Sequence, residues 1–174
     1  KTFNIRTSTL AFAKAMANYN TSLMEHFRSF PEIIRYSTEY FYKPAQMELI
    51  VNRIRTKPIT ETLKFIRVET KGQMPPNTNL DEIDTIIEDI EQRLVSGFQG
   101  TIGIICSFKA QAERMEQALN ERLDYPRLKQ THKLSVWFVR DVQGEERDIV
   151  YYSFVEDQEI KNAELWRIYP TIGG

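Results

Sequence analysis

The chain has 174 residues, of which 41 % are hydrophobic and 11 % aromatic, so one compact domain with a real core is expected. Its formal net charge of −1 gives none of the strong basic excess of dedicated nucleic-acid binders, although it does not exclude a local groove. No apolar run reaches the roughly 18 residues of a membrane span, and the single Cys106 fits a reducing, cytoplasmic compartment.

The first part of the chain predicts a mixture of short elements. Apolar residues at helical spacing predict a helix over 7–18, and a short strand is expected within 21–27. Ser29 and Glu32 have the spacing of a capping box, and Pro31 fits the first turn, so a helix is expected from there to about Phe41.

The middle of the chain, residues 43–98, is the least certain and reads as an insertion or a variable region. A short helix is expected around 45–54 in an otherwise irregular stretch, and the alternation in 63–69 predicts a strand. Prolines and a glycine predict a loop over 71–79. An acidic face alternating with isoleucines predicts a helix over 80–97, closed by Gly97.

The last part of the chain has the clearest pattern. Apolar runs at 100–107, 133–139 and 148–155 predict buried strands, and an amphipathic helix is expected over 109–123. Buried strands alternating with helices predict an α/β fold with a mainly parallel sheet flanked by helices. Ligands of such sheets bind at the carboxyl ends of the strands, which directs attention to the loops after Ser107 and Val139.

Several familiar catalytic patterns are absent or weak in the 174 residues. There is no phosphate-binding G-x-x-x-x-G-K-[ST] sequence, no G-x-S-x-G and no Cys/His metal spacing. His26 and His132 are isolated, and Cys106 lies in an apolar run, so structural roles are expected for all three. The triplets Glu69-Thr70-Lys71 and Glu159-Ile160-Lys161 leave a metal-dependent nuclease as a minor alternative.

The segment "VRDVQGEERDIVYYSFV", residues 139–155, resembles motif V of superfamily 1 helicases, in which Gln-Gly-x-Glu-x-Asp leads into a buried strand ending in Ser. The likeness is nearest to the branch of large bacterial and RNA-decay helicases. Two further segments occur in the family's order. "LMEHFRSFPEIIRYSTEYFY" resembles the aromatic-Arg-Ser segment, and "IGIICSFKAQAERMEQAL" resembles the next strand and helix.

This resemblance implies a RecA-like domain of the P-loop NTPase type, built in three layers, with a nucleotide site shared between two domains. Phe27 would be the aromatic that packs on adenine, and Arg28 the arginine finger that reaches the γ-phosphate. Gly144 and Glu146 would be the motif V nucleotide contacts, with Gln143 as a coupling residue. A guanidinium suits the finger role because it is always charged and grips two phosphate oxygens at once.

The resemblance also implies a track for single-stranded nucleic acid, DNA in preference to RNA. The matching positions are Ser107, Phe108 and Gln111, and Arg140 is an additional candidate for a phosphate contact. The chain departs from the family pattern at two places. Cys106-Ser107 replaces the usual Thr-Pro, and Phe138 replaces the Thr that commonly opens motif V.

Residues 1–174 are therefore expected to form a single second motor domain, a fragment of a longer protein. ATP and Mg²⁺ would be used by the full-length protein, with Mg²⁺ held by the first RecA-like domain, and no cofactor is expected on this fragment, which should be inactive alone. The main alternative is a degenerate RecA-like module that binds nucleic acid or protein without motor activity. The flanking gene sequence would separate the two, since a motor needs a P-loop upstream.

Overall fold

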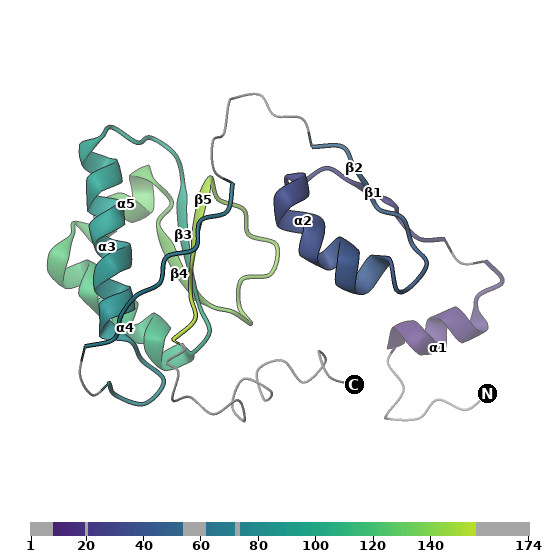
Figure 1. The fold of residues 1–174 in the computed structure, drawn as a ribbon, viewed down its shortest axis with the longest axis horizontal. Helices are drawn as coiled ribbons and strands as arrows, with labels where there is room; N and C mark the ends of the chain where they lie inside the picture. Colours follow the sequence, from purple (N-terminus) through teal and green to yellow (C-terminus); the bar gives the residue numbers. More distant parts are fainter. Residues whose placement is uncertain (1–8, 20, 54–61, 72–73, 156–174) are drawn as a thin grey trace. The chain divides into compact units, whose positions relative to one another are not determined.

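The computed structural model describes residues 9–19, 21–53, 62–71 and 74–155, and the chain divides into two compact units, Lys1–Ile66 and Arg67–Gly174 (Figure 1). The two units are described separately below. That residues 1–174 make a single domain stays a prediction.

The first unit contains short helices and a two-stranded parallel pair. Its elements are α1 (Thr9–Met16), β1 (Glu25–His26), α2 (Pro31–Ser37), the π-helix η1 (Thr38–Tyr42) and β2 (Ile50–Val51). β1 pairs with β2 in the register Glu25 to Ile50 and His26 to Val51. The expected helix near 45–54 is therefore wrong in its described part, because pairing with β1 holds this segment extended.

The start of α2 also differs from the expected capping box. The N-cap is Phe30 rather than Ser29, and it makes no side-chain cap hydrogen bond. Pro31 occupies the first turn, where its missing N–H leaves one fewer donor to satisfy. Ser29 instead donates its backbone N–H to Nε2 of His26, at 2.8 Å.

The second unit is an α/β layer built on a three-stranded parallel sheet. Its elements are α3 (Leu80–Val95), β3 (Ile102–Cys106), α4 (Lys109–Arg122), α5 (Tyr125–Thr131), β4 (Ser135–Phe138) and β5 (Ile149–Ser153). The strand order is β4-β3-β5, and both pairings are parallel. The predicted α/β class and parallel sheet are thus confirmed, and this is a RecA-like arrangement.

Two further segments were predicted differently. The expected strand over 63–69 is wrong, because residues 62–71 have no regular structure. Phe65 is 86 % exposed, so the alternating pattern of this segment does not mark a buried face. Helix α5 was not expected, although Asp124 caps it by accepting the N–H of Arg127.

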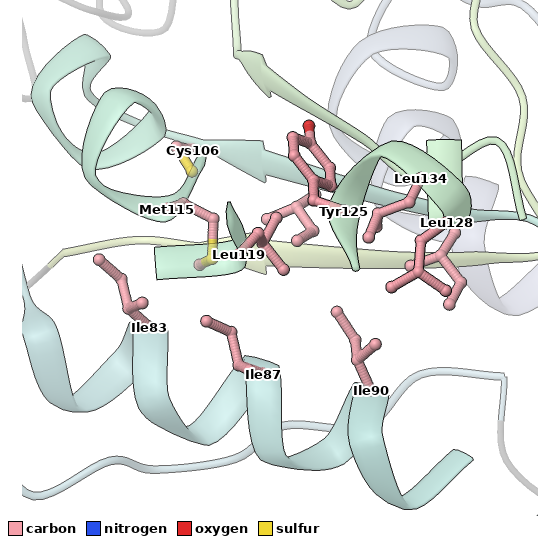
Figure 2. Close-up of a cluster of buried hydrophobic side chains, with 11 residues drawn as sticks. Ile83, Ile87, Ile90, Cys106, Met115, Leu119, Tyr125, Leu128 and Leu134 are labelled. Carbon is pink, nitrogen blue, oxygen red and sulfur yellow. The ribbon is translucent and has the colours of Figure 1, made fainter. Parts of the chain in front are cut away.

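The core of the second unit lies between the sheet and the helices α3 and α4, which pack against it (Figures 1 and 2). Figure 2 shows Ile83, Ile87 and Ile90 projecting from α3 toward Met115 and Leu119 of α4. These isoleucines recur at helical spacing, which is why the acidic residues between them face outward. The helix predicted over 80–97, within the region 43–98 that the sequence left least certain, is therefore a central part of the core.

Among the described residues, no helix combines the length and the apolar character needed to cross a membrane.

Candidate nucleotide and nucleic-acid site

The motif V loop, residues 143–148, lies in the connection between β4 and β5. Both strands run parallel to β3 and flank it, so this connection must return from the carboxyl end of β4 to the start of β5. Figure 1 shows it projecting on the side of the sheet away from α3. The loop is therefore long enough to present side chains while both of its ends are held by the sheet.

The exposed part of the motif V loop is built around a glycine. Gly144 has φ +87°, a backbone region that favours glycine, and an added Cβ would meet no atom within 4 Å. The position therefore favours glycine because of its positive φ angle, and not because a side chain would clash with its surroundings. Gln143, Gly144 and Glu146 are all exposed, so the three predicted nucleotide contacts are available at the surface together.

The last residue of the motif fixes the loop to the sheet. The Asp148 carboxylate accepts the backbone N–H of Thr101 at 2.7 Å and the Thr101 hydroxyl at 2.8 Å. The Thr101 hydroxyl oxygen in turn accepts the N–H of Asp148 at 3.0 Å. This reciprocal set joins the starts of β3 and β5, so Asp148 has a structural task in a motif whose other polar residues face outward.

Arg147, which the sequence pattern treats as variable, is the one partly buried residue of the loop. Its side chain is only 12 % exposed, and its guanidinium lies 4.8 Å from the centre of the Trp137 ring. It also forms an ion pair with Glu145 at 2.8 Å. Nothing in the motif's spacing marks this residue, because its burial depends on β4 and on Gly103 of β3.

The predicted nucleic-acid contacts meet at the carboxyl edge of the sheet, but they differ in access. Arg140 is exposed in the turn after β4, with its guanidinium 5.9 Å from the Phe138 ring. Ser107 and Gln111 are fully buried, and Phe108 is 8 % exposed. This burial argues against direct contact of these three with a strand, and their predicted role stays a prediction.

Gln111 has a clear structural use instead. Its amide oxygen accepts the N–H of Asn79 at 2.8 Å, and its amide nitrogen donates to the Asn79 carbonyl at 3.0 Å and to the Ser153 hydroxyl at 3.0 Å. Ser153 donates to the Glu82 carboxylate at 2.6 Å. These bonds join α3, α4 and the end of β5 in one buried polar network.

The same network holds an unusual backbone. Val155 is 2 % exposed and has φ +62°, a region that β-branched residues rarely adopt. Both oxygens of Glu82 accept its N–H, at 3.1 and 3.2 Å. A strained conformation persists where its surroundings fix it, and here the carboxylate of Glu82 does so.

Burial near this network also affects Cys106. Desolvation raises the pKa of its thiol to about 12, and the negative charge of Glu82 contributes in the same direction. The thiol is thus neutral at ordinary pH, in agreement with the expected structural role.

Phe27 and Arg28 lie in the first unit, in the bend that follows β1. Both are exposed, and the Phe27 side chain is 59 % accessible. The bend is held by the bond from the Ser29 N–H to His26, and the ring of Phe30 lies 5.3 Å from the guanidinium of Arg53. An aromatic and an arginine are therefore presented side by side just before α2.

The predicted site residues fall into two groups by unit. Phe27 and Arg28 belong to the first, and those of the motif V loop and the sheet edge belong to the second.

The isolated His132 and two residues of the first Glu-x-Lys triplet make structural contacts. Nδ1 of His132 lies 2.9 Å from the carbonyl oxygen of Gly100. Thr70 accepts from the Asn79 side chain, and the Lys71 N–H bonds Asp81. No group of three His, Cys, Asp or Glu within the described residues is placed to hold a metal ion. The Glu159-Ile160-Lys161 triplet lies outside those residues.

Comparison with known proteins adds a family and two relatives. The profile of a family described as "AAA domain" matches residues 7–169. The putative helicase mov-10-B.1 of Danio rerio is 24 % identical over 162 residues, which cover 81 % of this chain and 16 % of the relative. The uncharacterized ATP-dependent helicase MG140 homolog of Mycoplasma pneumoniae is 28 % identical over 169 residues, covering 90 % of this chain and 15 % of the relative. The chain thus spans less than a fifth of either protein.

Proposed function

Because the chain belongs to the AAA domain family and is a superfamily 1 helicase-like domain, we propose that it is the second motor domain of an ATP-dependent helicase. Its task would be to complete a nucleotide site whose phosphate-binding half lies in another domain of the full-length protein. Both relatives are named as helicases, and both are much longer than this chain.

The observation that carries this proposal is the motif V loop. Gln143, Gly144 and Glu146 are exposed together on a loop whose end is tied to the sheet by Asp148. A carboxylate such as Glu146 accepts hydrogen bonds from the hydroxyls of a ribose, and a fixed loop holds it ready for that contact. The arrangement favours nucleotide recognition by a preformed surface.

Arg28 is the proposed arginine finger. It is exposed beside Phe27 at the entrance to α2, so both side chains are accessible to a nucleotide held by another domain. The guanidinium would stabilise the charge that develops on the γ-phosphoryl group, and Phe27 would stack on the base. Mg²⁺ would be held by the other domain.

The proposed track for single-stranded nucleic acid begins at Arg140. It is the exposed cation of the predicted set, and phosphate contacts from arginine give affinity without reading sequence. Ser107, Phe108 and Gln111 would shape the edge beneath it. Closing and opening of the two motor domains with each ATP would then move the protein along the strand.

The test is nucleic-acid-stimulated ATP hydrolysis by the full-length protein, measured with single-stranded DNA and with RNA. Arg28→Ala should lower kcat by about 10³-fold or more, as removal of an arginine finger does, with a much smaller change in KM for ATP. Arg28→Lys should not restore turnover, because an ammonium lacks the planar fork. Arg35→Ala, at an exposed arginine of α2, is the matched control and should behave as wild type.

Unchanged turnover in Arg28→Ala would remove the finger assignment. A wild-type protein that binds nucleic acid but never hydrolyses ATP would instead favour the module without motor activity.

A further inference from the structure

We propose that Arg147 is a positioning residue that sets the geometry of Glu146 and thereby the affinity for ATP. This inference rests on the proposed function of the motif V loop and adds a residue to it. Arg147 is 12 % exposed in its side chain, whereas residues 143–146 and Asp148 are exposed. A partly buried arginine inside an exposed loop needs an explanation, because withdrawing a guanidinium from water is costly unless its donors find partners.

The Arg147 guanidinium joins the loop to β4. Toward the sheet, Nε donates to the Lys133 carbonyl at 3.1 Å and Nη2 donates to the Ser135 hydroxyl at 3.4 Å. The group also lies over the Trp137 ring, at 4.8 Å. The side chain is thus anchored on β4 and on the residues just before it.

Toward the loop, the same guanidinium holds the two residues before it. Nη1 donates to the Glu145 carboxylate at 2.8 Å and to the Glu146 carbonyl at 2.8 Å. Fixing the carbonyl of Glu146 fixes its peptide plane, and with it the direction in which the Glu146 side chain leaves the backbone. Only arginine offers donors in such a planar fork, so lysine at this position would lose part of the set.

The sheet has a space that fits this arrangement. A Cβ added at Gly103 would lie 2.5 Å from Cζ3 of Trp137 and 3.1 Å from Cγ of Arg147. The contact with Trp137 is too close for any side chain larger than glycine unless the ring shifts, and the contact with Arg147 is tight. Gly103 therefore makes room on β3 for the ring and for the stem of the arginine.

The experiment measures KM for ATP and kcat in the full-length protein. Arg147→Lys should raise KM by about tenfold, the size of one charge-assisted hydrogen bond, with a smaller change in kcat. Arg127→Lys, at an exposed arginine of α5, is the matched control and should leave both constants unchanged. The milder variant Glu145→Gln removes only the ion pair and should raise KM about twofold.

A double-mutant cycle with Glu146→Gln separates positioning from general stability. If Arg147 acts through Glu146, Arg147→Lys should add little to the KM of Glu146→Gln. Two effects that simply add would overturn the inference and leave the proposed function intact. If Glu146→Gln alone leaves KM unchanged, the proposed nucleotide contact fails, and the role of Arg147 fails with it.

The proposal can still be tested if Arg147→Lys fails to fold. If Arg147→Lys loses its cooperative melting transition, the result for Glu145→Gln decides, and a wild-type KM there overturns the proposal.

Discussion

At the scale of single residues, Cys106 gives a prediction about alkaline stability. Burial, with the charge of Glu82, raises its pKa to about 12, whereas a thiol in an unfolded chain ionises near pH 8.5. Between these two pH values the folded state keeps a proton that the unfolded state has lost. The free energy of unfolding should therefore be unaffected below about pH 8 and should fall as the pH rises, by up to about 1.4 kcal/mol per pH unit for this proton.

Urea unfolding of the chain at a series of pH values measures this slope, and Cys106→Ala is the comparison. The variant should be less stable at pH 7 because it leaves a small cavity, but its stability should fall less steeply between pH 8.5 and 10. Burial also raises the pKa of Tyr125 and Tyr151, but tyrosines ionise in the unfolded chain only near pH 10. The change in stability between pH 8.5 and 10 is therefore assigned to the thiol. Equal slopes for both proteins would show that the thiol is not the group responsible.

The residue scale also shows where sequence reasoning stops. The resemblance to motif V was enough to single out Gln143, Gly144 and Glu146, and the structure presents all three at the surface. It could not single out Arg147, because its importance comes from Trp137 and Gly103, which are distant in sequence. For Gln111 the resemblance implied a nucleic-acid contact, but the Asn79 backbone and Ser153 occupy its amide.

At the scale of elements, Glu82 links the first turn of α3 to the end of β5. Removing its side chain in Glu82→Ala would leave the Ser153 hydroxyl and the Val155 N–H without their shared acceptor, and would release the positive-φ turn. Loss of such acceptors typically costs about 2 kcal/mol, so the midpoint of urea unfolding should fall clearly. Glu88→Ala, at an exposed glutamate on the same helix, makes the same change in helix propensity and should have little effect.

If Glu82→Ala and Glu88→Ala lose similar amounts of unfolding free energy, helix propensity rather than the Val155 turn explains the loss.

The elements that were predicted well are those with a strong local signal. Continuous apolar runs predicted β3, β4 and β5, and isoleucines at helical spacing predicted α3. β2 was missed because only its pairing with β1, more than twenty residues earlier, makes it a strand. The cap of α5 was readable at Asp124, but a helix of 7 residues is too short for periodicity to identify it.

At the scale of the whole molecule, the proposed division of labour predicts that this chain alone cannot turn over ATP. Its 174 residues contain no P-loop sequence, so they lack the backbone cradle and the lysine that bind the β- and γ-phosphates. An arginine finger contributes only when another site already holds the nucleotide. The isolated chain should therefore release no phosphate above background, with or without single-stranded nucleic acid, whereas the full-length protein should be stimulated by it.

The same preparation of the chain can show that this inactivity is not a folding failure. A cooperative melting transition would establish the fold, and Arg140→Ala should weaken any binding of single strands to it, about equally for different sequences and less at high salt. Phosphate release by the isolated chain that Glu146→Gln abolishes would mean that residues 1–174 hold a complete nucleotide site. The role of a second motor domain would then have to be abandoned, because that role requires another domain to hold the nucleotide.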